Sequence, residues 1–192
     1  IRGTSRRGYS TKVSALNRSY HDVIEILGAS GMTITPTVGI QGAFQWIAAQ
    51  DSALLGDRRF TTLFPAWIVE SARASVEAAR RELPAREARL RPLGQTVRAV
   101  VDAGGRVIAG TDAPIIPFAI SLHAELEAYV RGGLSPFEAL QTATVNAADA
   151  LGASADLGTI EPGRLADLVV VEGDPLRDIR AARAVRLVVR GG

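Results

Sequence analysis

The sequence predicts an α/β protein, the final part of a (β/α) barrel followed by a small β appendage. Helix, glycine and strand alternate on either side of a long interruption, as in βαβ units. The apolar run 106–110 ends in a carboxylate, Asp112, and Pro114 then turns the chain. From Leu157 onward the sequence becomes rich in β-branched residues. The C-terminal strand ends of (β/α) barrels carry catalytic groups, so the position of Asp112 favours a catalytic role.

Composition excludes several classes of protein. The chain has 192 residues, 47% hydrophobic and 22% charged, enough for one domain or two small ones. Net charge is only +2, arginines alternate with acidic residues and 5% of residues are aromatic, which argues against nucleic-acid binding. The sequence has no cysteine, hence no thiolate metal site, and no apolar run near the roughly 18 residues of a membrane span.

The first 38 residues predict a loop, a helix and a strand. Residues 1–18 are polar and glycine-containing, as in a loop. Ser19 is a candidate N-cap for a helix that ends near Gly28. Residues 32–38 are rich in β-branched side chains and predict a short strand.

Residues 39–94 interrupt this alternation of helix and strand. The segment is too long for an ordinary barrel connection. Pro84 divides the Ala/Arg/Glu-rich stretch 68–91, so we expect two helices there. We expect the aromatic residues of this insertion to form a lid over an apolar substrate, the core of a helical hairpin, or a contact between copies of the chain. These residues are Phe44, Trp46, Phe60, Phe64 and Trp67.

The alternation of helices and strands resumes after residue 94, and sequence patterns mark the later helices, strands and turns. Ser135 to Glu138 form a capping box with proline at the first helical position. Pro162 and Gly163 occupy the centre of a type II turn. The predicted elements are helix 95–103, strand 106–110, helix 121–131, helix 136–151, a buried strand at 167–171 and a strand at 185–190.

These segments, in this order, resemble the amidohydrolase superfamily of metal-dependent hydrolases, and most closely its prolidase-like and imidazolonepropionase-like branch. The motifs are Gly110-Thr-Asp-Ala-Pro114, Leu122-His-Ala-Glu-Leu-Glu127, Leu134-Ser-Pro-Phe-Glu-Ala-Leu140, Thr144-Val-Asn-Ala-Ala148 and Gly158-Thr-Ile-Glu-Pro-Gly-Arg-Leu-Ala-Asp167. The resemblance implies that 106–110 is the eighth strand of a (β/α)8 TIM-type barrel. Residues 1–156 would then be the C-terminal part of the barrel, and 157–192 part of a small β-sandwich domain.

The resemblance also implies a reaction. Asp112 would coordinate a divalent metal, most often zinc, in a site that holds one or two ions. It would also take the proton of the attacking water. The expected activity is hydrolysis of C–N bonds in peptides or related small amides, with lactam, ester and deamination chemistry also open. The residues alone leave an alternative, in which Asp112 is a turn residue or a helix N-cap.

The other metal ligands of the family have no counterpart in this sequence. Its only histidines are His21 and His123, and a zinc site needs about three protein ligands. We therefore expect the chain to be inactive without an upstream half that carries the histidine ligands. The alternative is a non-catalytic accessory subunit that keeps the fold without the metal.

Three further residues are candidates for substrate contact. His123 lies near the expected barrel mouth and contacts either substrate or the Asp112 loop, or is a structural histidine. Arg2 and Tyr9 fall on a loop at the catalytic face, where an arginine could bind a substrate carboxylate through two hydrogen bonds. A solvated loop is the alternative for both. We expect His21 to be a surface or capping residue.

Overall fold

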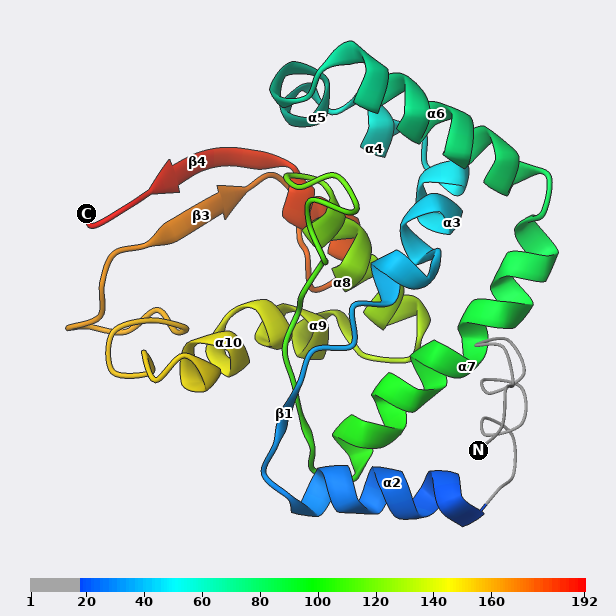
Figure 1. Ribbon diagram of the computed structural model, residues 1–192. Coiled ribbons are helices and arrows are strands. Elements are labelled where there is room, and N and C mark those ends of the chain that lie inside the picture. The colour runs from blue at the N-terminus through cyan, green and yellow to red at the C-terminus, as the bar shows by residue number, and fades with distance from the viewer. Residues whose placement is uncertain (1–17) are drawn as a thin grey trace.

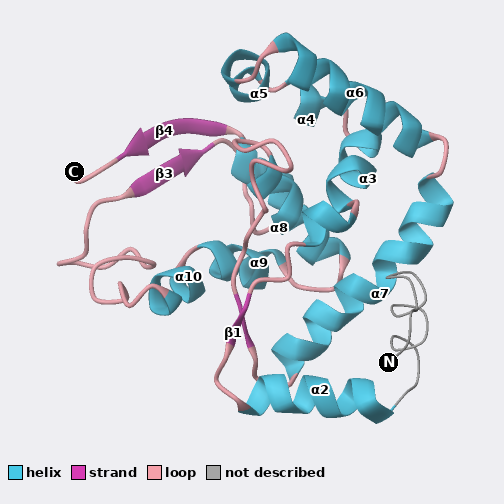
Figure 2. Ribbon diagram, in the orientation of Figure 1, coloured by secondary structure: helices cyan, strands magenta, loops and turns pink. Residues whose placement is uncertain are grey.

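The computed structural model describes residues 18–192, which form mainly helices together with two small two-stranded sheets (Figure 1, Figure 2). The elements are, in chain order, α2 (Arg18–Ala29), β1 (Thr33–Ile34), the 3-10 helix η1 (Val38–Gln41), α3 (Ala43–Gln50), α4 (Ala53–Gly56), α5 (Arg58–Leu63), α6 (Ala66–Arg80), α7 (Leu83–Asp102), β2 (Arg106–Val107), α8 (Ser121–Arg131), α9 (Pro136–Ala143), α10 (Val145–Ala150), β3 (Leu168–Val171), the 3-10 helix η2 (Ile179–Arg183) and β4 (Val185–Val189).

β1 and β2 pair in parallel, and both run from α2 toward α8 in Figure 1. Each strand is much shorter than the predictions for 32–38 and 106–110. The last bond to β1 runs from the Ile108 N–H to the Ile34 carbonyl at 2.9 Å, while the Ala109 N–H, on the opposite edge, donates to the Thr142 carbonyl at 3.0 Å. On the other side Pro36 has no N–H to donate.

The core lies between α8 and the insertion. α3 packs against both α6 and α8, and therefore joins the insertion to the barrel-type elements. The largest fully buried side chains of the core are Tyr129, Phe44, Phe60, Ile47, Leu54 and Ile120. α7 and α8 also approach very closely, because a Cβ on Gly94 would lie 2.5 Å from the Cα of Gly132.

The insertion forms helices, and the chain breaks before Pro84 as predicted. α6 ends at Arg80, and α7 begins at Leu83 with a proline in its first turn. The prediction of a separate helix at 95–103 is wrong, because α7 continues through Pro92 to Asp102. Burial of Leu90 and Val97 on one face holds α7 together despite the internal proline.

The segment after α8 follows its predicted start but not its predicted length. The Ser135–Glu138 capping box is present at the start of α9. The predicted helix 136–151 divides at Thr144, where the backbone leaves the helical region. The division allows the side-chain amide of Asn146 to donate to the Val107 carbonyl of β2 at 3.0 Å. Two shorter helices thus replace the single predicted helix, and the second of them contacts β2.

The C-terminal segment contains the antiparallel pair β3–β4 and the predicted turn, with Gly163 at φ 90°. The prediction that 167–171 is a buried strand is wrong, because Val169 is 60% exposed and Val188 on β4 is 63% exposed. No second sheet covers this pair among residues 18–192.

At the other end of the described chain, α2 already includes Ser19, which is therefore not its N-cap.

Candidate active site

Asp112 lies in an exposed turn beyond the end of β2. Its backbone is left-handed, with φ 52°, a conformation that Asp and Asn adopt more readily than most residues. Its carbonyl accepts a 2.9 Å hydrogen bond from the Ile115 N–H. This turn presents the Asp112 side chain to solvent.

Gly110 allows the approach to Asp112. A Cβ at this position would overlap with the methyl group of Thr35, which follows β1. Only glycine lets the two segments pass this closely. The glycine of the Gly-Thr-Asp sequence thus brings the ends of the two parallel strands together.

Glu125 of α8 holds the segment after β1. Its carboxylate is fully buried and accepts hydrogen bonds from the backbone N–H groups of Val38, at 2.7 Å, and Gly39, at 2.6 Å. Thr37, immediately before them, has a left-handed backbone with φ 46°. Glu125 thus satisfies the N–H groups that this sharp turn exposes.

The surroundings of Glu125 link it electrostatically to the candidate catalytic residue. Burial raises the pKa of Glu125, and the charge of Asp112 adds to the rise, whereas the two N–H groups and the Tyr129 hydroxyl oppose it. Burial and the Glu125 charge raise the pKa of Tyr129, whose hydroxyl oxygen also lies 3.4 Å from the Ile108 carbonyl oxygen. The buried pair therefore connects the segments that follow both strands.

Sequence reasoning assigned no role to Glu125. One signal could have found it: Glu125 shares a helical face with Ser121 and Tyr129, four residues before and after, and all three are buried. A carboxylate on the buried face of a helix needs hydrogen-bond donors.

His123 lies in the first turn of α8, and it contacts the insertion. Its Nε2 is 3.5 Å from a guanidinium nitrogen of Arg59, and its Nδ1 is buried without a hydrogen-bond partner among the described residues. Burial and the Arg59 charge lower the pKa of His123 to about 4, although Asp57 opposes this. The imidazole is therefore neutral at neutral pH.

The remaining predicted site residues are placed less directly. Arg2 and Tyr9 lie outside the described residues, and His21 belongs to α2. The insertion aromatics divide: Phe60 is buried, Trp67 is 69% exposed, and Trp46 lies 4.6 Å below the Arg131 guanidinium.

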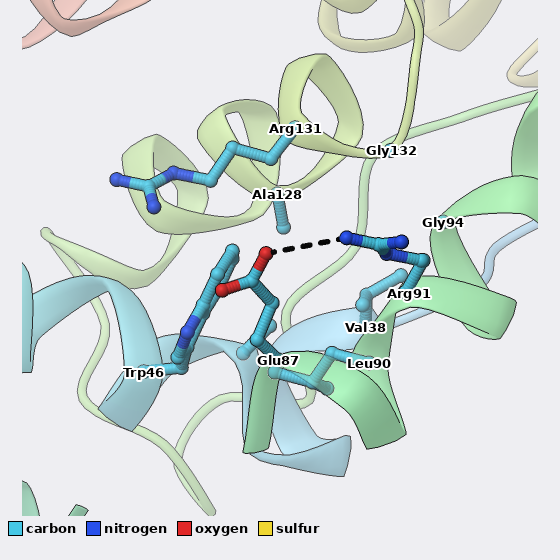
Figure 3. A pocket seen from close by; sticks show the side chains of 10 residues that line it. Val38, Trp46, Glu87, Leu90, Arg91, Gly94, Ala128, Arg131 and Gly132 are labelled. Atoms are coloured by element: carbon cyan, nitrogen blue, oxygen red, sulfur yellow. Dashed lines mark ion pairs between the residues drawn. The ribbon is translucent and has the colours of Figure 1, made fainter. Parts of the chain in front are cut away.

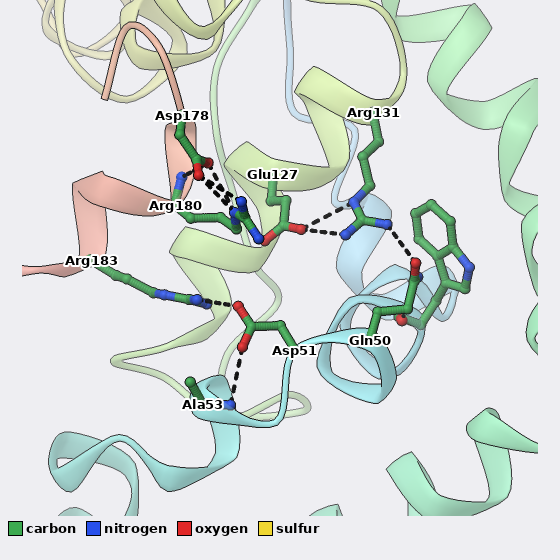
Figure 4. Close-up of polar contacts among 9 residues, drawn as sticks. Gln50, Asp51, Ala53, Glu127, Arg131, Asp178, Arg180 and Arg183 are labelled. Carbon is green, nitrogen blue, oxygen red and sulfur yellow. Dashed lines mark hydrogen bonds and ion pairs between the residues drawn. The ribbon is translucent and has the colours of Figure 1, made fainter. Parts of the chain in front are cut away.

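Charged side chains join the insertion to α8 and link it to the C-terminal segment (Figure 4). Asp51 pairs with Arg183 of η2. Arg131 of α8 pairs with Glu127 at 2.6 Å and donates to the Gln50 side chain at 3.0 Å. These contacts fix the insertion against both α8 and η2.

A cavity of about 140 Å³ lies between α3, α7 and α8 (Figure 3). Its charged groups are already engaged, because Arg131 binds Glu127 and Gln50 while Glu87 pairs with Arg91 at 3.6 Å. Asp112 does not line this cavity. We therefore take the strand ends, and not this cavity, as the candidate active site.

Of the metal ligands that the family resemblance implies, the described residues contain one candidate, Asp112. Within residues 18–192, no cluster of three His, Asp or Glu side chains could hold a metal ion. Asp112 alone fits, as an exposed carboxylate at a strand end. As a separate finding, no helix within residues 18–192 is both long and apolar enough to cross a membrane.

The comparisons with known proteins decide the family. The amidohydrolase family model matches residues 6–192. The chain belongs to the amidohydrolase family. Over 97 residues it is 39% identical to an ochratoxinase from Aspergillus niger, covering 48% of this chain and 20% of that protein. Over 81 residues it is 40% identical to an imidazolonepropionase from Symbiobacterium thermophilum, covering 38% and 18%.

A third relative of this amidohydrolase chain is adenine deaminase 2 from Rhizobium meliloti, 53% identical over 66 residues, 33% of this chain and 11% of that protein. The chain thus spans a fifth or less of these curated relatives. A crystal structure of a Xaa-Pro dipeptidase with bound methionine in the active site has a TM-score of 0.59 and 24% identity, covering 88% of this chain and 36% of that one. This likeness and the family match indicate a TIM-barrel-type fold, of which residues 18–192 form no closed barrel.

Proposed function

We propose that this chain is the C-terminal half of a metal-dependent amidohydrolase that hydrolyses C–N bonds in small amides or peptides. The observation that carries the proposal is Asp112, an exposed carboxylate beyond the end of β2, where Gly110 brings the ends of two parallel strands together. Catalytic residues of TIM barrels come from this end of the strands. Family membership supports the same assignment.

Asp112 would be one ligand of a divalent metal, for which we propose zinc. Such an ion lowers the pKa of a bound water from about 15.7 to about 7 and polarises the scissile carbonyl. The carboxylate of Asp112 acts as general base: it accepts a proton from the attacking water and returns it to the leaving nitrogen. Glu125 positions the segment after β1 beside the Asp112 turn and does not itself contact the substrate.

The proposed C–N bond specificity rests on the relatives. Deamination of adenine breaks a C–N bond, and an adenine deaminase shares 53% identity with this chain over 66 residues. We propose a peptide or a related amide as the substrate of this chain, because its motifs resemble the prolidase-like branch of the superfamily.

The rest of the metal site and of the barrel would come from an upstream half of the same enzyme. β1 pairs only with β2 among residues 18–192, so its other edge has room for a further strand, whereas the outer edge of β2 already bonds to Thr142 and Asn146. β3 and β4 expose apolar side chains, including Val169 and Val188, on a sheet that needs a cover. We therefore expect the chain alone to be inactive.

The second candidate is an accessory subunit that keeps the fold without the metal. Residues 18–192 contain no group of three metal ligands, which both candidates expect, so the upstream sequence decides between them. An upstream sequence with a His-x-His pair and two later strand-end histidines supports the enzyme. An upstream sequence without them supports the accessory subunit.

The test is Asp112→Asn in the complete enzyme. Asn tolerates the left-handed backbone at φ 52°, so the turn is kept while the negative charge is lost. We expect turnover of a dipeptide and N-acyl amino acid panel to fall by about 10³-fold or more, because general-base catalysis alone contributes about 10²–10⁴-fold. Asp156→Asn, at an exposed position in the C-terminal segment, is the matched control. Near-normal turnover by Asp112→Asn overturns the proposal.

A further inference from the structure

The insertion contacts the loop that carries Asp112 through an aromatic pair. The rings of Phe64 and Phe118 have centroids 4.3 Å apart and an interplanar angle of 39°. Phe118 belongs to the loop between β2 and α8. Phe64 is anchored in turn by Phe60, whose ring centroid is 5.3 Å away and whose side chain is fully buried. An element far from the loop in sequence therefore supports it.

Polar contacts hold the same part of the insertion in place. Arg59 of α5 binds Asp57 at 2.5 Å, donates to the Arg183 carbonyl at 3.0 Å and lies 3.5 Å from His123. The neutral imidazole of His123 does not repel this guanidinium. In Figure 1, α5 lies beyond the loop that follows β2, at the end toward which both strands run. The position of α5 is thus fixed from two sides.

The supported loop, which also contains Asp112, presents apolar side chains to solvent among residues 18–192. Ile115 is 73% exposed, Phe118 is 44% exposed and Leu122, at the start of α8, is 39% exposed. Asp112 is the only charged residue in the segment 111–120. A substrate group that contacts this loop therefore meets an apolar surface with one carboxylate.

We propose that Phe118, supported by Phe64, is a specificity-determining residue that contacts a large apolar side chain of the substrate. The inference rests on the proposed function and narrows it to amides whose acyl or amino part carries an aromatic or long aliphatic group. Phe118 is half-exposed and its other side packs on Phe64, so a substrate group could pack on a ring that is already held in contact, which lowers the entropy cost of binding. The insertion acts through Phe64 as a support.

The experiment compares matched substrates on the complete enzyme. Each pair differs only by phenylalanine or alanine: two dipeptides, and two N-acetyl amino acids. Phe118→Ala is expected to lower the ratio of kcat/KM for the phenylalanine and alanine members by about tenfold, mostly through KM, because apolar pockets discriminate by about 10–200-fold. Phe118→Leu should keep part of the ratio. Phe137→Ala changes an exposed phenylalanine of α9 and should keep all of it.

The outcomes separate this inference from the proposed function. Equal loss on both members of a pair, or an unchanged ratio with a lower Tm, overturns the inference and means that Phe118 packs against the rest of the barrel. If Phe118→Ala does not fold, an unchanged ratio in Phe118→Leu overturns it equally. If the wild-type enzyme hydrolyses no substrate of the panel, the proposed function fails and the inference fails with it.

Discussion

The Glu125 carboxylate accepts a 2.6 Å hydrogen bond from the backbone N–H of Gly39, which lies 86 residues earlier in the chain. The same carboxylate accepts from the Val38 N–H at 2.7 Å. A Cβ on Gly39 would lie 3.0 Å from Glu125 and 2.8 Å from Ile116, a buried residue of the Asp112 loop. α8 and the two strand ends are therefore packed as one unit.

Glu125→Gln should destabilise the fold, because an amide oxygen can replace only one of the two acceptor atoms and its NH₂ group would face the other N–H. Leaving a buried donor unsatisfied costs about 1–3 kcal/mol. Denaturant unfolding of the complete enzyme measures this loss. Glu87→Gln, whose exposed carboxylate is 3.6 Å from Arg91, should change stability by no more than about 0.5 kcal/mol. Equal stability of the two variants would contradict the role of Glu125.

Gly110→Ala should destabilise the fold and displace the Asp112 turn, since the new methyl group would overlap with Thr35. Overpacking of this kind costs about 1–3 kcal/mol. Gly56→Ala is the control, because a Cβ there meets nothing within 4 Å. Thermal unfolding compares the two, and a Gly110→Ala variant as stable as Gly56→Ala would show that the segments are not this close.

Glu138 should contribute to stability in a pH-dependent way. The Ser135 N–H, Arg98 and the Ser135 hydroxyl lower the pKa of Glu138 to about 2, from 4.5 in the unfolded chain. A lowered folded pKa stabilises the fold above pH 4.5, and this contribution is lost as pH falls toward 2.

Glu138→Gln should therefore cost about 1 kcal/mol at neutral pH, as expected for loss of a capping interaction that solvent partly screens. The difference from wild type in unfolding free energy should shrink between pH 4.5 and pH 2. A difference that does not change over this range would mean that the carboxylate charge contributes nothing.

His123 should remain neutral until strongly acidic pH. Burial and Arg59 lower the pKa of His123 from 6.5 to about 4, so the fold loses stability as pH falls from 6.5 through 4. NMR titration of the histidine ring protons measures this pKa directly, with His123→Gln used to assign the signal. A midpoint near 6.5 would show that the ring is exposed to solvent and does not contact the insertion.

The parts of this structure that the sequence predicts depend on local signals. The Ser135–Glu138 capping box, helix 121–131 and the break before Pro84 follow from residues close together in the chain, and all are present. Gly-Thr-Asp likewise indicates a turn after an apolar run, which is where Asp112 lies.

The parts that sequence reasoning missed depend on distant partners. Thr144 interrupts a predicted helix because Asn146 bonds to the carbonyl of Val107 on β2. β3 is exposed because no second sheet covers it among residues 18–192. Glu125 acquires its role only through N–H groups 86 and 87 residues away. The spacing of Glu125 from Ser121 and Tyr129 indicates a shared helical face, but no local pattern identifies the distant groups that these residues contact.

The metal content of the complete enzyme tests the central claim most directly. Native mass spectrometry reads polypeptide and bound metal together, for wild type and for Asp112→Asn. We predict one or two divalent ions in the wild type, with upstream sequence in the same particle, and fewer ions in Asp112→Asn at unchanged fold. A folded, metal-free wild type, or equal metal content in the two proteins, would contradict the assignment of Asp112 as a metal ligand.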